Sequence, residues 1–321
     1  MRRILTVRNI QDWPSWDLVY EWEDVLSKEM KIPLLLENTK FTNKYVRKIT
    51  GIYALRRIGC KIFAFEMGPE IRSGFRNARN YKSYYPCIID FFLTKDDIAA
   101  FEKQYNNNRV VFISSKEAYD VLKTENCRLN ICHLPLSLSD KYRISPKTHF
   151  EKKYDLVLVG RQNPVLSKYL EMYSQEHPDL YIAYRKMENN KFFYFTNKGE
   201  KLGDINTREQ YMQLLRLAKA SLYSTPGMDD DSGRTRGYNQ VTPRFLEMLA
   251  CGVNPVMRYA DNSDTRYFEL SSFGSSIDTY DEFVEALENA VKNPADMKKN
   301  ALYLEKHYTS CIAEKLNEIM K

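Results

Sequence analysis

Residues 242–257 constrain the fold of this chain more than any other segment. Thr242 is a suitable N-cap, because a threonine hydroxyl can accept a hydrogen bond from a backbone N–H at a helix start. Pro243 fits the first helical position, where its missing N–H costs nothing. Gly252 fits the position after a helix, which often needs a left-handed backbone, and a short strand, Val253–Met257, follows. The segment predicts a helix, a tight turn and a buried strand, which is the repeating unit of α/β proteins.

The rest of the chain alternates in the same way between apolar runs and segments with helical periodicity, so we expect an α/β fold with parallel sheets. In the first half we expect strands at Arg3–Val7, Pro33–Leu36, Lys61–Phe65, Cys87–Phe92, Arg109–Ile113 and Asn130–Leu134, and helices at Leu18–Lys28, Tyr45–Ile58, Asp96–Tyr105 and Lys116–Lys123. In the second half we expect strands at Tyr154–Val159, Leu180–Tyr184 and Ala220–Ser224, a strand or hairpin edge at Lys191–Asn197, and helices at Pro164–His177, Thr207–Ala218, Asp281–Lys292 and Leu302–Met320.

Composition excludes several classes of protein. The chain has 321 residues, of which 43% are hydrophobic, and this is enough for two ordinary domains. No apolar run is long enough to span a bilayer, and residues 1–8 lack the apolar core of a signal peptide, so we expect a cytoplasmic protein. The six cysteines form no C-x-x-C pair and the four histidines have no ligand spacing, so we expect reduced thiols and no zinc site.

The net charge of +6 is modest for this length. It fits an enzyme with anionic substrates, or one that also makes peripheral contact with the inner face of a membrane. Without a nucleic-acid-binding motif, it does not predict a nucleic-acid partner.

Three arginines gather around the predicted helix start, namely Arg234, Arg236 and Arg244. A helix N-terminus offers free N–H groups and the positive end of the helix dipole, and arginine binds phosphate bidentately. Glu247 lies one turn into the helix, where a carboxylate can accept hydrogen bonds from ribose hydroxyls. These residues favour a nucleotide-diphosphate site; the alternative is a solvated basic loop balanced by Asp229–Asp231.

The run PRFLEMLACGVNPV resembles the nucleotide-sugar-binding segment of GT-B glycosyltransferases of the group 1, or GT4-like, family. In particular it resembles the CgeB-like branch, in which a GYNQVTPR loop precedes this helix. The likeness covers residues 234–256 and implies that Glu247 holds the ribose and that the preceding backbone holds the diphosphate. The donor-binding residues it implies are Arg236, Gly237, Tyr238, Asn239, Gln240, Thr242, Arg244 and Glu247. Many retaining members carry a glutamate where this chain has Asn239, so the sugar and the stereochemistry stay open.

The resemblance also implies a GT-B fold, in which two Rossmann-like domains face each other across a cleft. We expect an acceptor-side domain over residues 1–150 and a nucleotide-sugar-binding domain over residues 151–300, joined by the polar linker Ser137–Lys153. The resemblance implies that a C-terminal helix, residues 301–321, packs back on the first domain.

Arg161 closes the first strand of the second half, and loops at the carboxyl ends of parallel strands are where α/β folds bind ligands. Related enzymes place an arginine here and a lysine several residues on, which implies that Arg161 and Lys168 contact the donor diphosphate. The alternative is that both are surface residues.

The acceptor side is less marked in the sequence. If the enzyme inverts, it needs a general base near the acceptor hydroxyl, and Glu66 and Asp90 are the candidates because they lie at the ends of predicted strands. Trp13 and Trp16 can stack on a sugar or pack in the protein.

Other chemistries find little support. Asp229–Asp231 suggests the Asp-x-Asp metal site of GT-A enzymes, but four residues separate it from the preceding strand, so we expect no metal. Gly51 and Gly59 do not make a dinucleotide-binding fingerprint, and there is no Walker sequence. We therefore expect no cofactor other than a nucleotide-diphosphate sugar as co-substrate.

The sequence thus predicts a glycosyltransferase that moves a sugar from a nucleotide-diphosphate donor to a hydroxyl of a saccharide acceptor, such as a cell-surface glycan or a lipid-linked saccharide. Two alternatives stay open. One is a nucleotide-sugar epimerase or phosphorylase on the same architecture. The other is a non-catalytic module that binds a sugar nucleotide or assembles a coat. The oligomeric state is not predicted.

Overall fold

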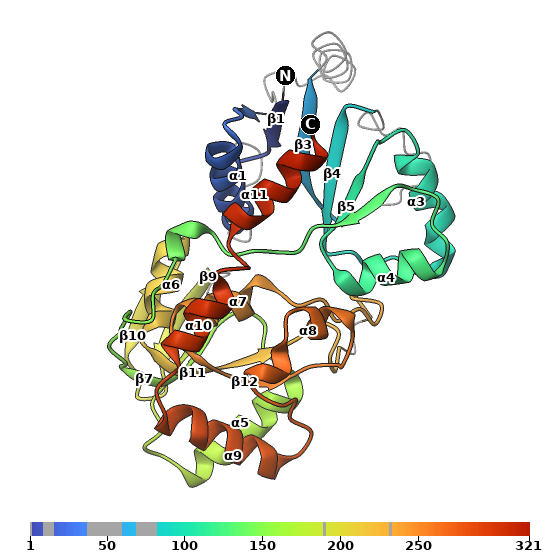
Figure 1. Cartoon of the computed structure of the whole chain (residues 1–321). Helices are drawn as coiled ribbons and strands as arrows, with labels where there is room; N and C mark the ends of the chain where they lie inside the picture. Colours follow the sequence, from blue (N-terminus) through green and yellow to red (C-terminus); the bar gives the residue numbers. More distant parts are fainter. Residues whose placement is uncertain (1, 9–15, 37–59, 69–81, 189–190, 231–232) are drawn as a thin grey trace. The chain divides into compact units, whose positions relative to one another are not determined.

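The computed structural model describes residues 2–8, 16–36, 60–68, 82–188, 191–230 and 233–321. The chain divides into two compact units, drawn in Figure 1: unit 1 is Met1–Asp140 with Tyr308–Lys321, and unit 2 is Lys141–His307. The division falls at Asp140, earlier than the expected residue 150, and again at His307. Each unit contains one six-stranded sheet covered by helices, which confirms the α/β class.

The sheet of unit 1 has the order β2-β1-β3-β4-β5-β6, and all of its pairings are parallel. Its strands are β1 (Arg2–Thr6), β2 (Leu34–Leu36), β3 (Lys61–Met67), β4 (Tyr84–Ile89), β5 (Val111–Ile113) and β6 (Ile131–His133). Its helices are α1 (Asp17–Met30), α3 (Ile98–Tyr105), α4 (Lys116–Thr124) and α11 (Thr309–Ile319). The chain leaves β1 toward β2 on one side and later returns to β3 on the other, so the order reverses between β1 and β3.

Helices α1 and α11 cover the same face of this sheet. Leu26 of α1 and Leu316 of α11 are buried in one cluster with Ile4 of β1 and Phe63 of β3. Fully burying side chains of this size contributes about 1.5–3 kcal/mol each, and this links the C-terminus of the chain to the first strand.

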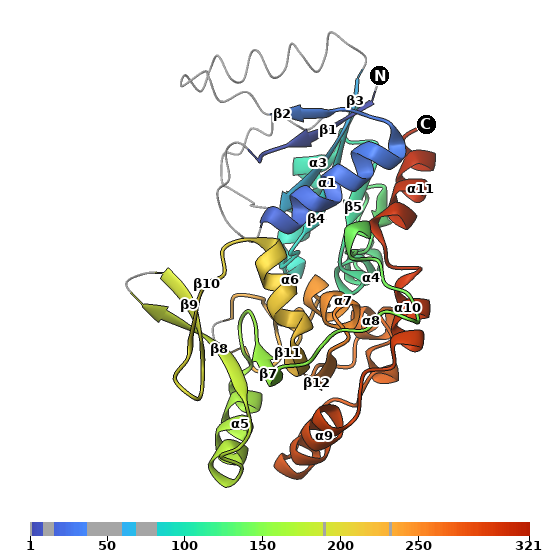
Figure 2. The same ribbon diagram turned by 90° about the vertical axis from the view of Figure 1, so that its left-hand side faces the viewer.

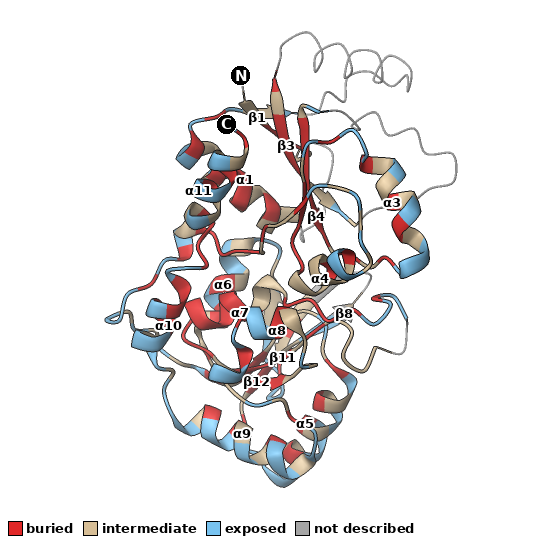
Figure 3. Ribbon diagram, turned by 45° about the vertical axis from the view of Figure 1, so that its right-hand side comes forward, coloured by how far each residue is buried: buried red, intermediate tan, exposed pale blue. Residues whose placement is uncertain are grey.

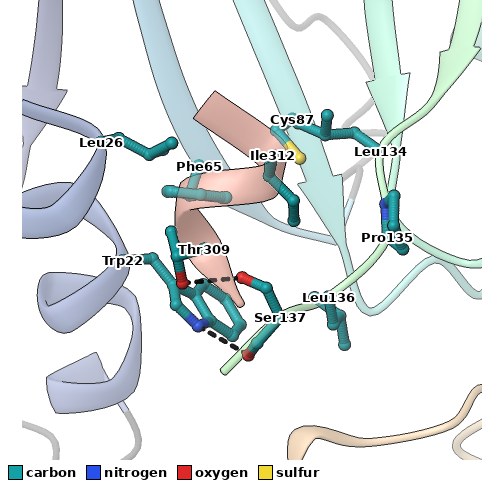
Figure 4. Close-up of a pocket in the computed structure, with 10 residues that line it drawn as sticks. All are labelled: Trp22, Leu26, Phe65, Cys87, Leu134, Pro135, Leu136, Ser137, Thr309 and Ile312. Carbon is teal, nitrogen blue, oxygen red and sulfur yellow. Dashed lines mark hydrogen bonds between the residues drawn. The ribbon is translucent and has the colours of Figure 1, made fainter. Parts of the chain in front are cut away.

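The start of α11 is fixed by polar contacts that Figure 4 shows around a small cavity. The Trp22 indole N–H donates to the backbone oxygen of Ser137 at 2.9 Å, and the hydroxyls of Ser137 and Thr309 lie 3.0 Å apart. The backbone N–H of Thr309 donates to Leu138 at 2.9 Å. The cavity itself has a volume of about 10 Å³, which is the size of one water molecule. It is therefore a packing defect and not a ligand site.

The sheet of unit 2 has the order β10-β9-β8-β7-β11-β12. Its strands are β7 (Tyr154–Leu158), β8 (Ile182–Glu188), β9 (Lys191–Thr196), β10 (Lys201–Asp204), β11 (Ala218–Ser224) and β12 (Asn254–Arg258). β8, β7, β11 and β12 are parallel, while β9 and β10 are antiparallel and extend the sheet at one edge, as Figure 2 shows. Here the order reverses between β7 and β11, so a ligand crevice is expected at the carboxyl ends of these two strands.

Helices cover both faces of this sheet. Those of unit 2 are α5 (Pro164–Glu176), α6 (Arg208–Arg216), α7 (Pro243–Ala250), α8 (Ser263–Tyr267), α9 (Tyr280–Lys292) and α10 (Met297–Leu304). Leu170 of α5 and Leu287 of α9 share one core with Leu156 of β7. Figure 3 shows α7 as an almost wholly buried helix, whereas α5 and α9 each keep an exposed face.

Local sequence signals explain most helix ends. Ser115 accepts from the N–H of Ala118 at 3.1 Å, and Thr207 forms a capping box with Gln210, as the sequence predicts. Gly252 has the left-handed backbone expected after α7, with φ of 62°.

Three expectations need correction or fall outside the structure. Thr242 is the N-cap of α7, but its side chain makes no capping bond; instead its N–H donates to the Tyr223 hydroxyl at 3.1 Å. The helix expected at Leu302–Met320 is broken between α10 and α11, because Tyr308 pairs with Leu138 as a β-bridge. The helix expected at Tyr45–Ile58 lies outside the described residues.

Candidate functional site

The candidate site lies at the carboxyl edge of the unit 2 sheet, where the loop after β7 meets the loop between β11 and α7. Arg244, in the first turn of α7, joins the two. Its Nη1 donates to the backbone oxygens of Val159 and Arg161, both at 2.9 Å. Its guanidinium carbon lies 5.3 Å from the centre of the Tyr223 ring on β11. The expected proximity of the α7 start to the first strand of this unit is thus present.

Gly160 is required for this arrangement. Its φ is +70°, and an added Cβ would lie 2.8 Å from Nη1 of Arg244. A side chain at this position would displace the arginine as well as strain the backbone. The glycine therefore allows the arginine to lie directly on the β7 loop.

Arg161, on the loop after β7, also contacts the loop after β11. Its Nη2 donates to the backbone oxygen of Pro226 at 2.8 Å, while the side chain stays exposed. A guanidinium carries five N–H donors, so this single bond leaves others for an anion. Lys168, the second residue expected at the donor diphosphate, lies on the exposed face of α5 and makes no ion pair with any residue that the structure describes.

A partly exposed ion pair that the sequence analysis did not predict holds the loop after β11. Asp229 has a left-handed backbone, with φ of 55°. It accepts from Arg258 at 2.6 and 2.9 Å and from Nδ2 of Asn163 at 2.8 Å. The hydrogen bonds from Arg258 lower the pKa of Asp229. Asn163 also caps α5, which its position before Pro164 would have indicated.

This ion pair occupies one of the three carboxylates of the metal alternative at Asp229–Asp231. Both Asp229 carboxylate oxygens accept from Arg258, and Asp231 lies outside the described residues. Within the described ranges, no group of three or more histidine, cysteine or acidic side chains can hold a metal ion.

Asn239 is turned inward and stabilises the loop. Its Oδ1 accepts from the Thr225 hydroxyl at 2.7 Å and its Nδ2 donates to the backbone oxygen of Gly237 at 3.0 Å. Tyr238 and Gln240 on either side are buried.

Arg236 and Gly237 are exposed and both have positive φ, of 51° and 87°. Of the predicted loop residues, these two therefore face solvent, while the three that follow them pack within unit 2.

Glu247 is almost completely buried, at 3% exposed. Its two oxygens accept from Nη2 of Arg208 at 2.7 Å and from the Tyr211 hydroxyl at 2.8 Å. The guanidinium of Arg208 also lies 5.1 Å from the Tyr211 ring centre. Burial, followed by the charge of Glu247, raises the pKa of Tyr211 well above its ordinary value. The sequence predicted Glu247 as a ligand residue but did not predict its partners, Arg208 and Tyr211.

The two predicted general bases lie in unit 1. Glu66 of β3 accepts from the hydroxyls of Tyr84 and Tyr105, each at 2.7 Å. Asp90 follows β4 directly and has a left-handed backbone, with φ of 54°. Trp16 stacks on Tyr20, with ring centres 6.2 Å apart, and Trp13 lies outside the described residues.

Comparisons with known proteins give the fold. No family model matches the sequence, and no curated protein matches it. Among solved structures, AviGT4, a glycosyltransferase involved in avilamycin A biosynthesis, is similar with a TM-score of 0.52 and 12% identity, over 100% of this chain and 97% of that one. A protein assigned as a UDP-N-acetylglucosamine 2-epimerase from Listeria monocytogenes is similar with a TM-score of 0.51 and 11% identity, over 98% of this chain and 94% of that one.

At these identities the likeness establishes the fold. The chain has a GT-B-type architecture of two Rossmann-like units, as predicted. Within the described part of the chain, every helix is too short or too polar to cross a membrane.

Proposed function

We propose that this chain is a glycosyltransferase that takes a nucleotide-diphosphate sugar as donor, binds it at the carboxyl edge of the unit 2 sheet and transfers the sugar to a hydroxyl of a saccharide acceptor. The observation that supports this most is the position of Arg244 and Arg161, which join the two loops at the point where the strand order reverses. In open α/β sheets this is where ligands bind, and two guanidinium groups beside a helix start suit a diphosphate. The proposal includes that the chain is related to the CgeB-like branch of GT-B glycosyltransferases, as the sequence of residues 234–256 suggests.

The donor's diphosphate would lie against Arg161, Arg244, the start of α7 and the exposed backbone at Arg236 and Gly237. Lys168 would contribute at longer range. As the bond between the anomeric carbon and the phosphate oxygen breaks, negative charge grows on the diphosphate. Preorganised guanidinium and N–H donors stabilise that charge more in the transition state than in the ground state.

The ribose would lie near Glu247. Its carboxylate already accepts two hydrogen bonds, from Arg208 and Tyr211, so it is fixed in place. Each carboxylate oxygen has a second lone pair, and these can accept from ribose hydroxyls. The resemblance assigns Glu247 this role, and the side chain's rigidity supports it.

The acceptor hydroxyl attacks the anomeric carbon as the diphosphate leaves, and its proton goes to a base or to the leaving group. Unit 1 offers Asp90 and Glu66 as bases. Glu66 is held by two tyrosine hydroxyls, and Asp90 follows the end of β4. Asn239, whose side chain is used within the loop, gives no support to a glutamate-like sugar contact.

We further propose that the reaction needs no metal and no other cofactor, since Asp229 is engaged by Arg258. The proposed acceptor is a surface or lipid-linked glycan, handled in the cytoplasm with peripheral contact to the membrane.

The first test is a thermal-shift screen with UDP, GDP, ADP, CMP and dTDP, each with and without Mg²⁺. A stabilisation of about 2.7 kcal/mol is expected at one hundred times the dissociation constant. Selective stabilisation by one diphosphate without Mg²⁺ supports the proposal, and a shift with none of them contradicts it.

The second test follows the matching nucleotide sugar over time. Release of nucleoside diphosphate that a saccharide acceptor accelerates indicates a transferase. Conversion of the sugar without release of nucleotide indicates an epimerase instead, and binding without any turnover indicates a non-catalytic module.

The site variant for both tests is Arg161→Gln, because Arg161 is exposed and its loss leaves the core intact. The matched control is Arg266→Gln, another exposed arginine of unit 2, whose partner is Asp261 on the surface. Diphosphate affinity should fall at least tenfold in the first variant and stay unchanged in the second.

A further inference from the structure

A second pocket of unit 2 lies at the opposite edge of the same sheet. Lys152 precedes β7, Lys219 is the second residue of β11, and Gly252 precedes β12, so the pocket is at the amino ends of these parallel strands. Its volume is about 250 Å³. It is lined mainly by apolar side chains with cations between them: His149, Phe150, Lys152, Lys219, Gly252, Val291, Lys292, Asn293, Pro294, Ala295 and Met297.

Lys152 places a mostly buried ammonium group in this pocket. Its Nζ donates to the backbone oxygens of Arg216 and Cys251, at 3.1 and 3.0 Å. These two bonds leave one ammonium hydrogen, and no carboxylate of the described chain forms an ion pair with it. Burial lowers the pKa of Lys152 to about 8. A buried charge without a counter-ion is costly, so an anion that enters the pocket is favoured.

Two further lysines line the same pocket, Lys219 and Lys292. Lys219 pairs with Asp155 at 2.8 Å. Lys292 is exposed at the rim, without an ion pair to the described chain. Within the described residues, Lys152 and Lys292 are therefore the two cations of the pocket that form no ion pair.

The ends of two helices partly offset the charge of Lys152, because its ammonium group binds the carbonyl of Arg216 at the end of α6 and that of Cys251 just after α7. Nδ2 of Asn254 binds the carbonyls of Ala290 and Asn293 at the end of α9, at 2.9 and 2.8 Å. Asp296 uses an oxygen to cap α10 at Lys299. These carbonyl groups are thus satisfied within the protein, and the third ammonium hydrogen of Lys152 has no acceptor among the described residues.

The geometry points to a second ligand site here, for a small amphiphilic anion: a phosphate or carboxylate head that pairs with Lys152 and Lys292, and an apolar body that packs on Phe150, Val291 and Met297. The charges select an anion, and the apolar lining selects one with a hydrocarbon part. The site is separate from the donor site, since the two lie at opposite edges of the unit 2 sheet.

The test measures binding to the full chain by calorimetry, with hexyl phosphate as the probe. Inorganic phosphate represents the anionic head alone, and hexanol represents the apolar body alone. Hexyl phosphate should bind at least tenfold more tightly than either of them. Lys292→Gln should weaken its binding about three- to fivefold, as expected for a partly exposed ion pair, and Lys152→Met should weaken it further. The matched control is Lys298→Gln, an exposed lysine of α10 that does not line the pocket.

Lys152→Met removes a helix-end contact and can destabilise the fold, so a second measurement uses the unaltered chain. NMR of ¹³C-dimethylated lysines follows the titration of Lys152. An anion beside the ammonium favours its charged form, so hexyl phosphate should raise the pKa of Lys152 from about 8, while hexanol should not.

Equal binding of hexyl phosphate to the parent chain, Lys292→Gln and Lys152→Met would overturn the assignment, as would a Lys152 titration that hexyl phosphate leaves unchanged. Equal affinity for inorganic phosphate and hexyl phosphate would overturn the amphiphilic class of the ligand. Hexanoate in place of hexyl phosphate distinguishes carboxylate from phosphate heads.

Discussion

Each unit of this protein buries a glutamate on a helix and pairs it with an arginine, but the two pairs differ in their surroundings. In unit 2, Glu247 accepts from Arg208 at 2.7 Å and from the Tyr211 hydroxyl at 2.8 Å. In unit 1, Glu23 accepts from Arg8 at 3.2 Å, and Arg8 also bonds Asp24 at 3.0 Å. Both carboxylates are at most 3% exposed. Glu247 therefore has two donors at 2.8 Å or less, whereas the arginine of Glu23 is more distant and also binds Asp24.

The difference matters for the charge state. Burial raises the pKa of Glu23 to about 7, against opposing hydrogen bonds from Thr6 and Arg8. A buried carboxyl takes up a proton when its donors do not compensate its lost hydration. The comparison teaches that burial beside an arginine does not by itself keep the pKa of a carboxyl such as Glu23 low.

The largest expected effect comes from removing the better-paired carboxylate. Glu247→Ala leaves the buried Arg208 guanidinium and the Tyr211 hydroxyl without their acceptor, and should lower the free energy of unfolding by about 3–5 kcal/mol. Urea denaturation measures this loss. Glu285→Ala, an exposed glutamate of α9, is the control and should change stability by less than about 0.5 kcal/mol. If Glu247→Ala lowers the free energy of unfolding no more than Glu285→Ala does, the Glu247–Arg208 pair contributes nothing to stability.

The second prediction concerns pH. The pKa of Glu23 is raised from its ordinary value of 4.5 to about 7, so the folded state holds a proton that the unfolded state has lost. The resulting stability is fully present below about pH 4.5 and disappears as the pH rises through 7, a change of about 3 kcal/mol. Glu23→Gln should remove this slope, as denaturation between pH 4 and 8 would measure. A parent chain and variant with parallel pH profiles would show that Glu23 is ionised throughout.

A smaller effect tests the second donor of Glu247. Tyr211→Phe removes one hydroxyl and leaves the Arg208 pair intact, so stability should fall by about 2 kcal/mol, as for other hydrogen bonds to a charged group. The same denaturation experiment measures it. A double-mutant cycle with Glu247→Gln should give a coupling above about 0.5 kcal/mol, and strict additivity would contradict the contact.

The smallest effect is expected at the exposed partner of Arg8. Asp24 has a side chain that is 59% exposed, so its ion pair with Arg8 is screened by solvent. Asp24→Asn should change the free energy of unfolding by at most about 1 kcal/mol, and less in 0.5 M salt. A loss as large as that of Tyr211→Phe would show that Arg8 depends on Asp24 more than on Glu23.

The position of Glu247 was predictable from the sequence, but the cost of replacing it was not. The proline, the glycine and the apolar period of residues 243–252 fix a helix whose second turn carries this glutamate. Its partners Arg208 and Tyr211 are 39 and 36 residues away and lie on α6. No local rule pairs them, because α6 and α7 are far apart in the sequence and meet only in the tertiary structure. A test of donor binding therefore has to separate affinity from stability.

In the loop after β11, too, the sequence predicted the kind of segment but not the contacts that its side chains make. Its glycines and acidic residues predict a polar connection, and its spacing from the preceding strand disfavours a metal site. The sequence does not predict that Arg258, at the end of β12, bonds both oxygens of Asp229. Asn239 likewise turned out to bond Thr225, which is 14 residues earlier.

The sequence by itself determined the α/β class, the caps of α4 and α6, the left-handed turn at Gly252 and the helix start that carries Arg244, because hydrophobic period and capping chemistry act over a few residues. Only the tertiary structure decided which arginine lies on Gly160, that Glu247 is held by Arg208 and Tyr211, and that Lys152 and Lys292 line one pocket. These contacts join residues that strand order and helix packing bring together, and such long-range pairing leaves no periodic trace in the chain.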